Sequence, residues 1–232
     1  MILSGTMLFS FGGPPIVTDD AFTAGDGQFD INLIYTKFGG IDATEFPVID
    51  VNYGMSETTE IKLEYVHVET SGHTLEVENF IETGIKWRFY ESETLFISTF
   101  PQYAYVGVEH DSKHEDINVI TLPIEITKKI GSQFGFTLEV GYQAWIDAKD
   151  SHLEHVLEWG TVFSYFPQDG TDILFDVNDK NDFKHVHRTS YLLGVKQALY
   201  KDNISLLLSG GYATYESHEN GAQIYTGLNF RF

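Results

Sequence analysis

The chain contains no cysteine, few basic residues and no long apolar run. Without cysteine, a disulfide framework and a thiolate metal site are both excluded. It has 14 Lys and Arg residues and 34 Asp and Glu residues, so its net charge is -20. Nucleic acid is a poor partner for such a chain, because the negative charge repels phosphate backbones. No segment approaches the roughly 18 apolar residues of a membrane-spanning helix. Such a chain can span a membrane only as a closed β-barrel, the other structure that satisfies every backbone group in lipid.

The chain has instead a strong alternation of apolar and polar side chains. Its 42% hydrophobic and 15% aromatic residues exclude a disordered chain, which is poor in both. The alternation has the period of a β-strand, and helical periodicity is almost absent. Pro101 makes one strand irregular. Twelve strands are predicted at residues 28–38, 46–53, 59–68, 79–90, 94–106, 117–128, 133–145, 157–166, 172–177, 189–199, 204–215 and 222–232.

The connections between these strands alternate between short and long. Short turns follow the even-numbered strands, at residues 54–58, 91–93, 129–132, 167–171 and 201–203. Longer polar loops follow odd-numbered strands, including residues 107–116, 146–156, 178–188 and 216–221. Outer-membrane barrels have short periplasmic turns and long extracellular loops. The sequence therefore predicts an all-β fold, an antiparallel up-and-down transmembrane barrel of about 12 strands over residues 28–232.

Soluble barrels also alternate apolar and polar residues, but the strand lengths and aromatic residues favour a membrane barrel. Many segments reach the roughly 9–11 residues that cross a bilayer at a tilt, against about five or six in soluble strands. Aromatic residues gather at both strand ends, as in the girdles of outer-membrane barrels. Those beside the short turns are Tyr53, Phe89, Phe134, Tyr165 and Tyr200, and those towards the long loops are Tyr35, Tyr65, Trp145, Trp159 and Tyr212.

The last strand carries a further indication of an outer-membrane location. It ends at Phe232, with Phe230 on the same face, a pattern that resembles the assembly signal of outer-membrane proteins. We therefore expect the chain in the cell outer membrane. The expected partners are membrane lipid, lipopolysaccharide, the outer-membrane assembly machinery and a small-molecule solute.

Two segments precede the first clear strand. Residues 1–12 are apolar and fit the end of a signal peptide, or an ordinary first strand. Residues 13–27 should not extend the sheet, because Pro14 and Pro15 cannot donate ladder hydrogen bonds. They are expected to form either a flexible periplasmic tail or a plug inside the barrel. In a plug, Asp19 and Asp20 could pair with basic residues of the inner wall, namely Lys62, Lys86, Arg88 or Arg231.

Several short motifs resemble a family of bacterial outer-membrane proteins. They are residues 13–20 (GPPIVTDD), 29–35 (FDINLIY), 49–54 (IDVNYG), 122–131 (LPIEITKKIG) and 225–232 (YTGLNFRF). The family is named for phenol-degradation meta-pathways, or labelled simply as transporters. Asp30 stands where the family usually has glutamate. The resemblance implies an outer-membrane barrel and suggests hydrophobic or aromatic compounds as solutes.

Charged residues collect on the predicted inner face of the barrel, because a charge on the lipid face costs about 2–4 kcal/mol near the midplane. Twelve strands lie between the roughly eight of a filled barrel and the 16–18 of an aqueous channel. This face therefore forms either a closed network of ion pairs or a narrow polar pore. The predicted lumen-lining residues are Glu60, Lys62, Glu64, Glu82, Lys86, Arg88, Glu125, Glu139, Glu158, Asp172, Asp176, Lys196 and Arg231.

All nine histidines lie in or beside the predicted long loops, interleaved with acids. The cluster His110, Asp111, His114 and Glu115 could hold Zn²⁺ or Cu²⁺, and acids alone could hold Ca²⁺ or Mg²⁺ bridging lipopolysaccharide. A solvated acidic surface is the simpler interpretation, because no spacing matches a known metal motif. No nucleophile elbow, phosphate loop or dinucleotide fingerprint occurs, so we expect neither an enzyme nor a cofactor.

Two functions remain open from the sequence. The first is passive transport of small molecules through a narrow channel, which should prefer cations if the lining is acidic. Neutralising Glu125 and Glu139 is then expected to weaken the preference. The second is a non-conducting structural or surface-binding barrel with acidic, cation-binding loops.

Deleting Phe232 should lower insertion into the outer membrane, because the deletion removes the terminal aromatic residue of the expected assembly signal. Quantifying the chain in isolated outer membranes checks this, with Phe232→Trp as the matched control that keeps an aromatic end. A purified chain that stays soluble and monomeric without detergent would overturn the membrane assignment.

Overall fold

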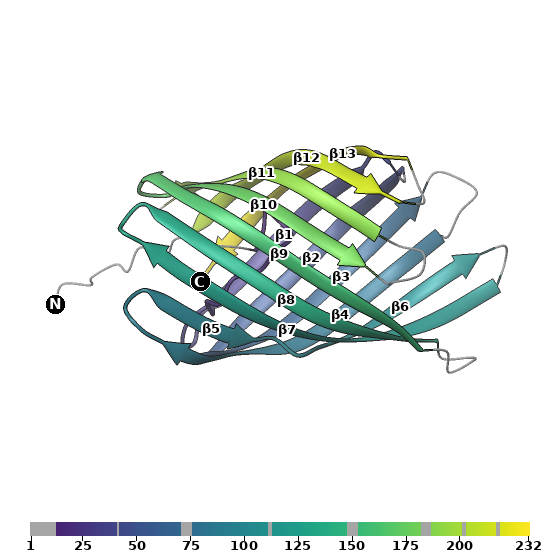
Figure 1. Cartoon of the computed structure of the whole chain (residues 1–232), viewed down its shortest axis with the longest axis horizontal. Helices are drawn as coiled ribbons and strands as arrows, with labels where there is room; N and C mark the ends of the chain where they lie inside the picture. The colour runs from purple at the N-terminus through teal and green to yellow at the C-terminus, as the bar shows by residue number, and fades with distance from the viewer. Residues whose placement is uncertain are drawn as a thin grey trace.

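The computed structural model describes residues 13–40, 42–70, 76–110, 113–147, 153–181, 187–200, 203–216 and 219–232, without the side chains of residues 70, 76–78, 108–110, 113–115 and 147. These residues form one antiparallel sheet rolled into a barrel (Figure 1). Within these ranges, no helix is long and apolar enough to cross a bilayer. The strands are β1 (Phe29–Phe38), β2 (Ala43–Ser56), β3 (Thr59–Thr70), β4 (Glu76–Glu91), β5 (Leu95–Thr99), β6 (Gln102–His110), β7 (Lys113–Ile130), β8 (Phe134–Asp147), β9 (Leu153–Gln168), β10 (Thr171–Asn181), β11 (His187–Tyr200), β12 (Ile204–Tyr215) and β13 (Gly221–Arg231).

The barrel closes through the pairing of β1 with β13, in the register Asp30 to Arg231. β5 and β6 both pair with β4 on one side and with β7 on the other, so they are two parts of one strand. The interruption lies at Phe100 and Pro101, where proline has no N–H group to donate to the ladder. The barrel therefore has 12 strands, and the predicted fold class is confirmed.

The connections confirm the asymmetry of the prediction but not the length of the loops. The short turns after β2, β4, β7 and β9 lie at one end of the barrel, together with the C-terminal end of β13, and we assign this end to the periplasm (Figure 1). At the other end, β6, β8 and β10 run on to His110, Asp147 and Asn181, well into the predicted loops. The prediction was wrong there because backbone ladder bonds continue through polar residues, whatever the side-chain pattern.

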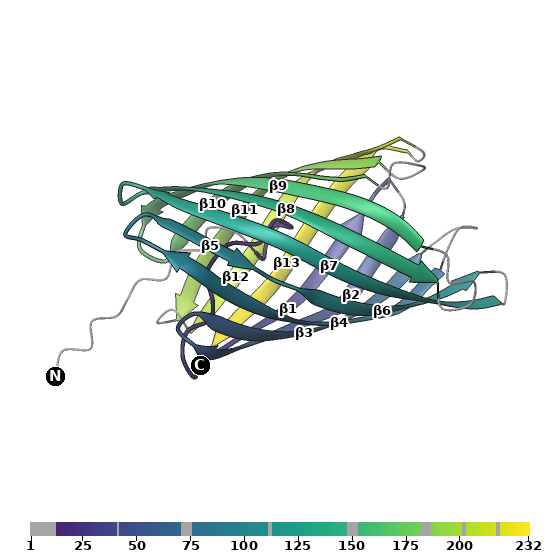
Figure 2. The same cartoon turned by 60° about the horizontal axis from the view of Figure 1, so that its bottom comes forward.

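The outer face of the barrel is an apolar belt. The strands, apart from the two parts β5 and β6, contain 10 to 18 residues, enough to cross the hydrocarbon of a bilayer at a tilt. Figure 2 shows this tilt from a second side. Exposed apolar side chains of the belt include Leu33, Ile61, Leu63, Ile85, Leu122, Val140, Phe163, Leu193, Leu208 and Ile224.

Polar pairs on the outer face mark the extracellular edge of the belt. The hydroxyl groups of Tyr65 and Tyr103 donate to the Asn79 and Asn118 side chains at 2.7 and 2.6 Å. These groups belong to the region where lipid head groups begin, as expected of an interfacial girdle. Trp145 was predicted for this girdle and instead faces the lumen, where the Lys180 ammonium lies 5.1 Å from its ring centre. The prediction failed because Trp145 shares the face of Gln143, two residues away.

Replacing Leu193 by arginine should destabilise the barrel by about 2–4 kcal/mol, because the charge would enter the apolar belt. Leu193 is 58% exposed on the outer face of β11, near the middle of the strand. Denaturant unfolding in lipid vesicles measures the difference. Glu93→Arg, in a periplasmic turn, is the control and should cost at most about 1 kcal/mol. Equal effects of the two changes would contradict the assigned belt.

Candidate functional site

The interior of the barrel holds a cavity of about 1240 Å³ that is lined by residues from every side of the wall. Apolar side chains line part of it, and charged side chains line the rest. Its acids are Asp19, Asp20, Asp30, Asp42, Glu45, Asp50, Glu60, Glu64, Glu82, Glu125, Glu139, Glu158 and Glu219, and its bases are Lys62, Lys86, Lys129, Lys180, Arg188, Lys196 and Arg231. Acidic side chains therefore outnumber basic ones in this lining by 13 to seven.

Residues 13–28, called the inner segment below, precede β1, and residues 13–24 of this segment lie inside the barrel (Figure 2). Ile16 is 2% exposed and packs against Val162, Leu174 and Leu192 of the wall. The Phe22 ring lies 4.6 Å from the ring of Phe96. The inner segment forms no strand, as expected from its prolines, and apolar contacts hold it in the lumen.

Wall carboxylates accept hydrogen bonds from the backbone of the inner segment. The N–H group of Val17 and the hydroxyl group of Thr18 donate to the Asp176 carboxylate at 3.2 and 2.6 Å. The N–H group of Asp19 donates to Glu139 at 2.7 Å. The inner segment pairs some of its N–H groups within itself, such as that of Gly13 with the Thr18 carbonyl, and these wall acceptors replace the missing ladder for others.

Two further contacts continue this series towards the periplasmic end. The N–H group of Ala21 donates to the Thr127 hydroxyl at 3.0 Å, and that of Ala24 donates to the Glu60 carboxylate at 2.5 Å. The series of acceptors runs along β10, β8, β7 and β3, so the inner segment crosses the lumen and contacts opposite sides of the barrel.

Lys86 is the central charge beneath the inner segment. Its ammonium donates to the Asp19 carboxylate at 2.7 Å and to the Asp20 carbonyl at 2.9 Å, and it lies 3.8 Å from Glu125. Glu125 is fully buried and also accepts from the Ser98 hydroxyl. One ammonium thus compensates carboxylates of both the inner segment and the wall.

Asp19 remains ionised in this position. Burial in the lumen raises the pKa of its carboxyl, but the Lys86 and Lys62 ammonium groups outweigh burial and place the pKa below the ordinary value. The ion pair between Asp19 and Lys86 therefore persists at neutral pH. It would weaken only as pH falls through the lowered pKa of Asp19.

Glycines in the wall make room for the inner segment. A β-carbon at Gly160 would overlap the Thr18 side chain, and one at Gly194 would lie 3.0 Å from Cγ2 of Ile16. Glycine in the interior of a strand often marks the close approach of another chain segment. This signal was present in the sequence, but without the fold it did not say what approaches.

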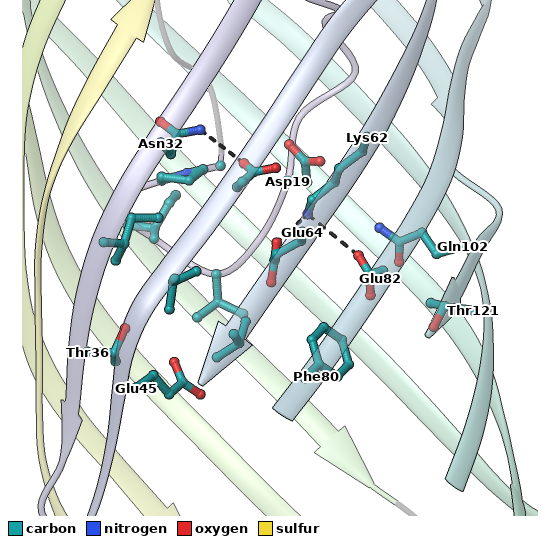
Figure 3. A pocket seen from close by; sticks show the side chains of 18 of the residues that line it. Asp19, Asn32, Thr36, Glu45, Lys62, Glu64, Phe80, Glu82, Gln102 and Thr121 are labelled. Carbon is teal, nitrogen blue, oxygen red and sulfur yellow. Dashed lines mark hydrogen bonds and ion pairs between the residues drawn. The ribbon is translucent and has the colours of Figure 1, made fainter. Parts of the chain in front are cut away.

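The upper part of the cavity, towards the extracellular end, has a second charge cluster (Figure 3). The Lys62 ammonium lies 2.9 Å from Glu64 and 3.6 Å from Glu82. The Asn32 amide donates to the neighbouring Asp50 at 3.0 Å. Two carboxylates thus share one ammonium, and a third, Asp50, is held beside them by an amide.

The structure assigns most of the predicted lumen-lining residues to the cavity wall. Ten of the 13 line the cavity itself, and the others are Arg88, Asp172 and Asp176. Asp176 is covered by the inner segment, Asp172 is buried opposite Lys196 in the ladder, and Arg88 donates to the carbonyl of Glu57 at 2.6 Å. The prediction omitted further charged residues of the cavity, namely Asp30, Asp42, Glu45, Asp50, Lys129, Lys180, Arg188 and Glu219.

Two of the predicted pore residues help to hold the inner segment, and their effect on ion selectivity stays a prediction. Glu125 and Glu139 were expected to set ion selectivity, but both contact the inner segment or its Lys86 partner. Carboxylates higher in the cavity are therefore better placed to meet a solute. Glu45, which ends up on the inner face, was missed because the β-bulge between Glu45 and Val48 shifts the strand phase.

The suggested metal cluster at His110, Asp111, His114 and Glu115 lies outside the described residues and side chains. Among the residues that the structure describes, no group of three or more potential ligands is arranged to hold a metal ion. His155 and His187 lie on strands, and His187 contacts the Asp179 carboxylate at 2.9 Å.

The burial of Ile16 gives a direct test of the inner segment. The chain lacks cysteine, so a single introduced thiol can be labelled without background. Ile16→Cys should react slowly with a maleimide and Val17→Cys rapidly, because the native side chains are 2% and 48% exposed. Adding Gly160→Val to Ile16→Cys should accelerate labelling by displacing Thr18. Gly210→Ala is the control for Gly160→Val, because nothing lies within 4 Å of a β-carbon at Gly210. Equal labelling rates for Ile16→Cys and Val17→Cys would contradict the described burial of Ile16.

Comparison with known proteins identifies the fold but no family. No family model matches the chain, and no curated protein matches it. The COG4313 outer membrane channel from Pseudomonas putida F1 has a TM-score of 0.69 at 11% identity, over 94% of this chain and 100% of that one. The NanC porin has a TM-score of 0.64 at 10% identity, over 86% and 98% of the two chains.

The KdgM porin, solved in complex with disordered oligogalacturonate, is also similar, with a TM-score of 0.60 at 8% identity over 88% and 99% of the chains. At such identities the likeness concerns the fold alone. The phenol-degradation family stays a resemblance of short motifs. The chain is a closed antiparallel barrel that resembles outer-membrane channels.

Proposed function

We propose that the chain is an outer-membrane channel through which small molecules diffuse passively, and that the inner segment narrows its path. The observation that carries this proposal is the cavity of about 1240 Å³ inside the barrel. A barrel whose only task was rigidity would be filled by side chains, as in barrels of about eight strands. The likeness of the fold to several outer-membrane channels supports the same proposal.

The inner segment makes the channel selective for small solutes. It reaches from the periplasmic end to the level of Gly160, near the middle of β9. The space beside it is bounded by Lys86, Glu139 and the segment itself. A solute of a few heavy atoms fits beside such a segment more easily than a solute made of several linked units does.

The lining argues against large anionic solutes. The KdgM porin was solved with an oligogalacturonate, a polyanion. In this chain, a polyanion would meet 13 acids and seven bases in the cavity lining. Hydrophobic or aromatic compounds, the solutes suggested by the motif resemblance, would find apolar wall residues such as Val66 and Phe80.

A second function, a non-conducting structural or surface-binding barrel, has one observation in its favour. The inner segment is fastened by hydrogen bonds to Asp176, Glu139, Thr127 and Glu60, and by the Lys86 ion pair. If these contacts never break, the periplasmic half stays closed. Membrane lipid, lipopolysaccharide and the assembly machinery remain the proposed partners of the outer face in both cases.

Conductance in planar bilayers distinguishes the two functions. The full chain should show small, steady conductance in KCl, and removal of residues up to Gly25 should raise it because the space held by the inner segment opens. Heat-dependent electrophoretic mobility, as a control, shows whether the truncated barrel remains folded. Silence of the full chain with conductance of the truncated chain would support the closed barrel, and silence of both would reject a channel.

A further inference from the structure

An apolar patch lines one side of the upper cavity. It consists of Ile34, Val48, Val66 and Leu207, with Val68, Phe80 and Tyr225 packed against them. Ile34 pairs with Val48, and Val48 with Val66, so the three form one row across β1, β2 and β3. The four core members are at most 6% exposed, and Leu207 does not line the cavity, so the apolar surface open to the lumen belongs mainly to the partly buried Val68, Phe80 and Tyr225.

Carboxylates follow this patch along the same wall. Glu64 is two residues from Val66 on the inner face of β3, and Glu82 is two residues from Phe80 on β4. Glu64 and Glu82 are paired in the ladder and share the single Lys62 ammonium. Figure 3 shows Glu45, Glu64 and Glu82 around one space, with Phe80 beside them.

Glu45 is a third carboxylate of the same region. Across the bulge from Val48, it pairs in the ladder with Thr36, whose side chain also faces the cavity. Among the described residues it forms no ion pair within 4.0 Å. Arg188 attracts this carboxylate from a longer distance, and the side chain lines the cavity that a solute would enter from the extracellular side.

A buried acceptor of the same region also lacks a partner. The amide oxygen of Gln223 has no hydrogen-bond donor among the described residues, although the residue is only 2% exposed. Gln223 lines the cavity on β13, opposite Phe38 of β1. A buried acceptor without a donor costs free energy, so it favours a solute that brings N–H groups.

The basic side chains lie across the barrel. Lys180 on β10 and Arg188 on β11 lie over the rings of Trp145 and Phe38, at 5.1 and 5.6 Å from the ring centres. In the order of strands, β10 lies opposite β3. The wall of β2, β3 and β4 thus has three carboxylates, Glu45, Glu64 and Glu82, for the one ammonium of Lys62. Arg188 attracts Glu45 and Lys180 attracts Glu82, but neither forms an ion pair with that carboxylate.

We propose that the solutes of this channel are small organic cations, in which a protonated amine is attached to an apolar body. The ammonium group would lie among Glu45, Glu64 and Glu82, and the apolar body would lie against Val68, Phe80 and Tyr225, the partly buried side chains of the patch. This inference rests on the proposed channel function and names its solute class. Anions would meet the carboxylates, and neutral compounds would leave the carboxylates and Gln223 without donors.

Reversal potentials in planar bilayers test the inference with 2-phenylethylammonium, methylammonium and phenylacetate as probes. Both ammonium ions should be more permeant than phenylacetate, and 2-phenylethylammonium should carry an advantage over methylammonium beyond that expected from its size. Glu45→Gln should lower the preference for both cations by about two- to fivefold, the loss of one partly screened charge contact. Glu93→Gln, which removes the same charge from an exposed turn, should change nothing.

A second variant tests the contribution of the apolar patch to the selection of solutes. Val68→Thr, at a partly buried position of the patch, keeps the shape of the side chain and adds a hydroxyl group. It should therefore lower the advantage of 2-phenylethylammonium over methylammonium and leave the preference over phenylacetate unchanged. Val66→Thr serves in the same way where Val68→Thr does not fold.

The outcomes separate the two proposals. Absence of KCl conductance in the full and truncated chains rejects the channel, and the solute class with it. Conductance in KCl without preference for 2-phenylethylammonium over phenylacetate overturns the solute class alone. So does a block of the KCl current by neutral 2-phenylethanol that is as strong as the block by 2-phenylethylammonium.

Discussion

The structure depends on the requirement that no backbone N–H or C=O group remain unpaired in lipid. The pairing of β1 with β13 meets this requirement by leaving no free sheet edge. Closure also gives the sheet an outer and an inner face, so that alternate residues of each strand point towards lipid or towards the lumen. The apolar belt with Leu193 and the acidic interior with Glu125 are the two consequences of one constraint.

An interior so rich in carboxylates needs compensation, and the inner segment supplies part of it. Its backbone N–H groups reach Asp176, Glu139 and Glu60, and Lys86 joins its Asp19 to the wall. Each partner thereby stabilises the other, since the segment has no ladder of its own and the carboxylates have few bases nearby. The inner segment is part of the folded interior and at the same time narrows the lumen.

Above the inner segment, the wall is asymmetric in both charge and polarity. Glu45, Glu64 and Glu82 follow an apolar row on one side, and Lys180 lies on the other, over the ring of Trp145. A uniformly polar pore would discriminate by size and net charge alone. The asymmetric wall can also discriminate between solutes of equal size and charge, according to whether the charged group is attached to an apolar body.

The sequence by itself determined the barrel, its 12 strands, the direction of most side chains and the short turns, because strand alternation and turn residues are local properties. Local patterns could also assign Glu60, Lys86 and Glu125 to the inner face. Only the tertiary structure decided the phase of Glu45 after its bulge, the inward position of Trp145 and the seat of Ile16 against Leu174 and Leu192. These features depend on contacts between residues far apart in the chain, for which strand periodicity carries no information.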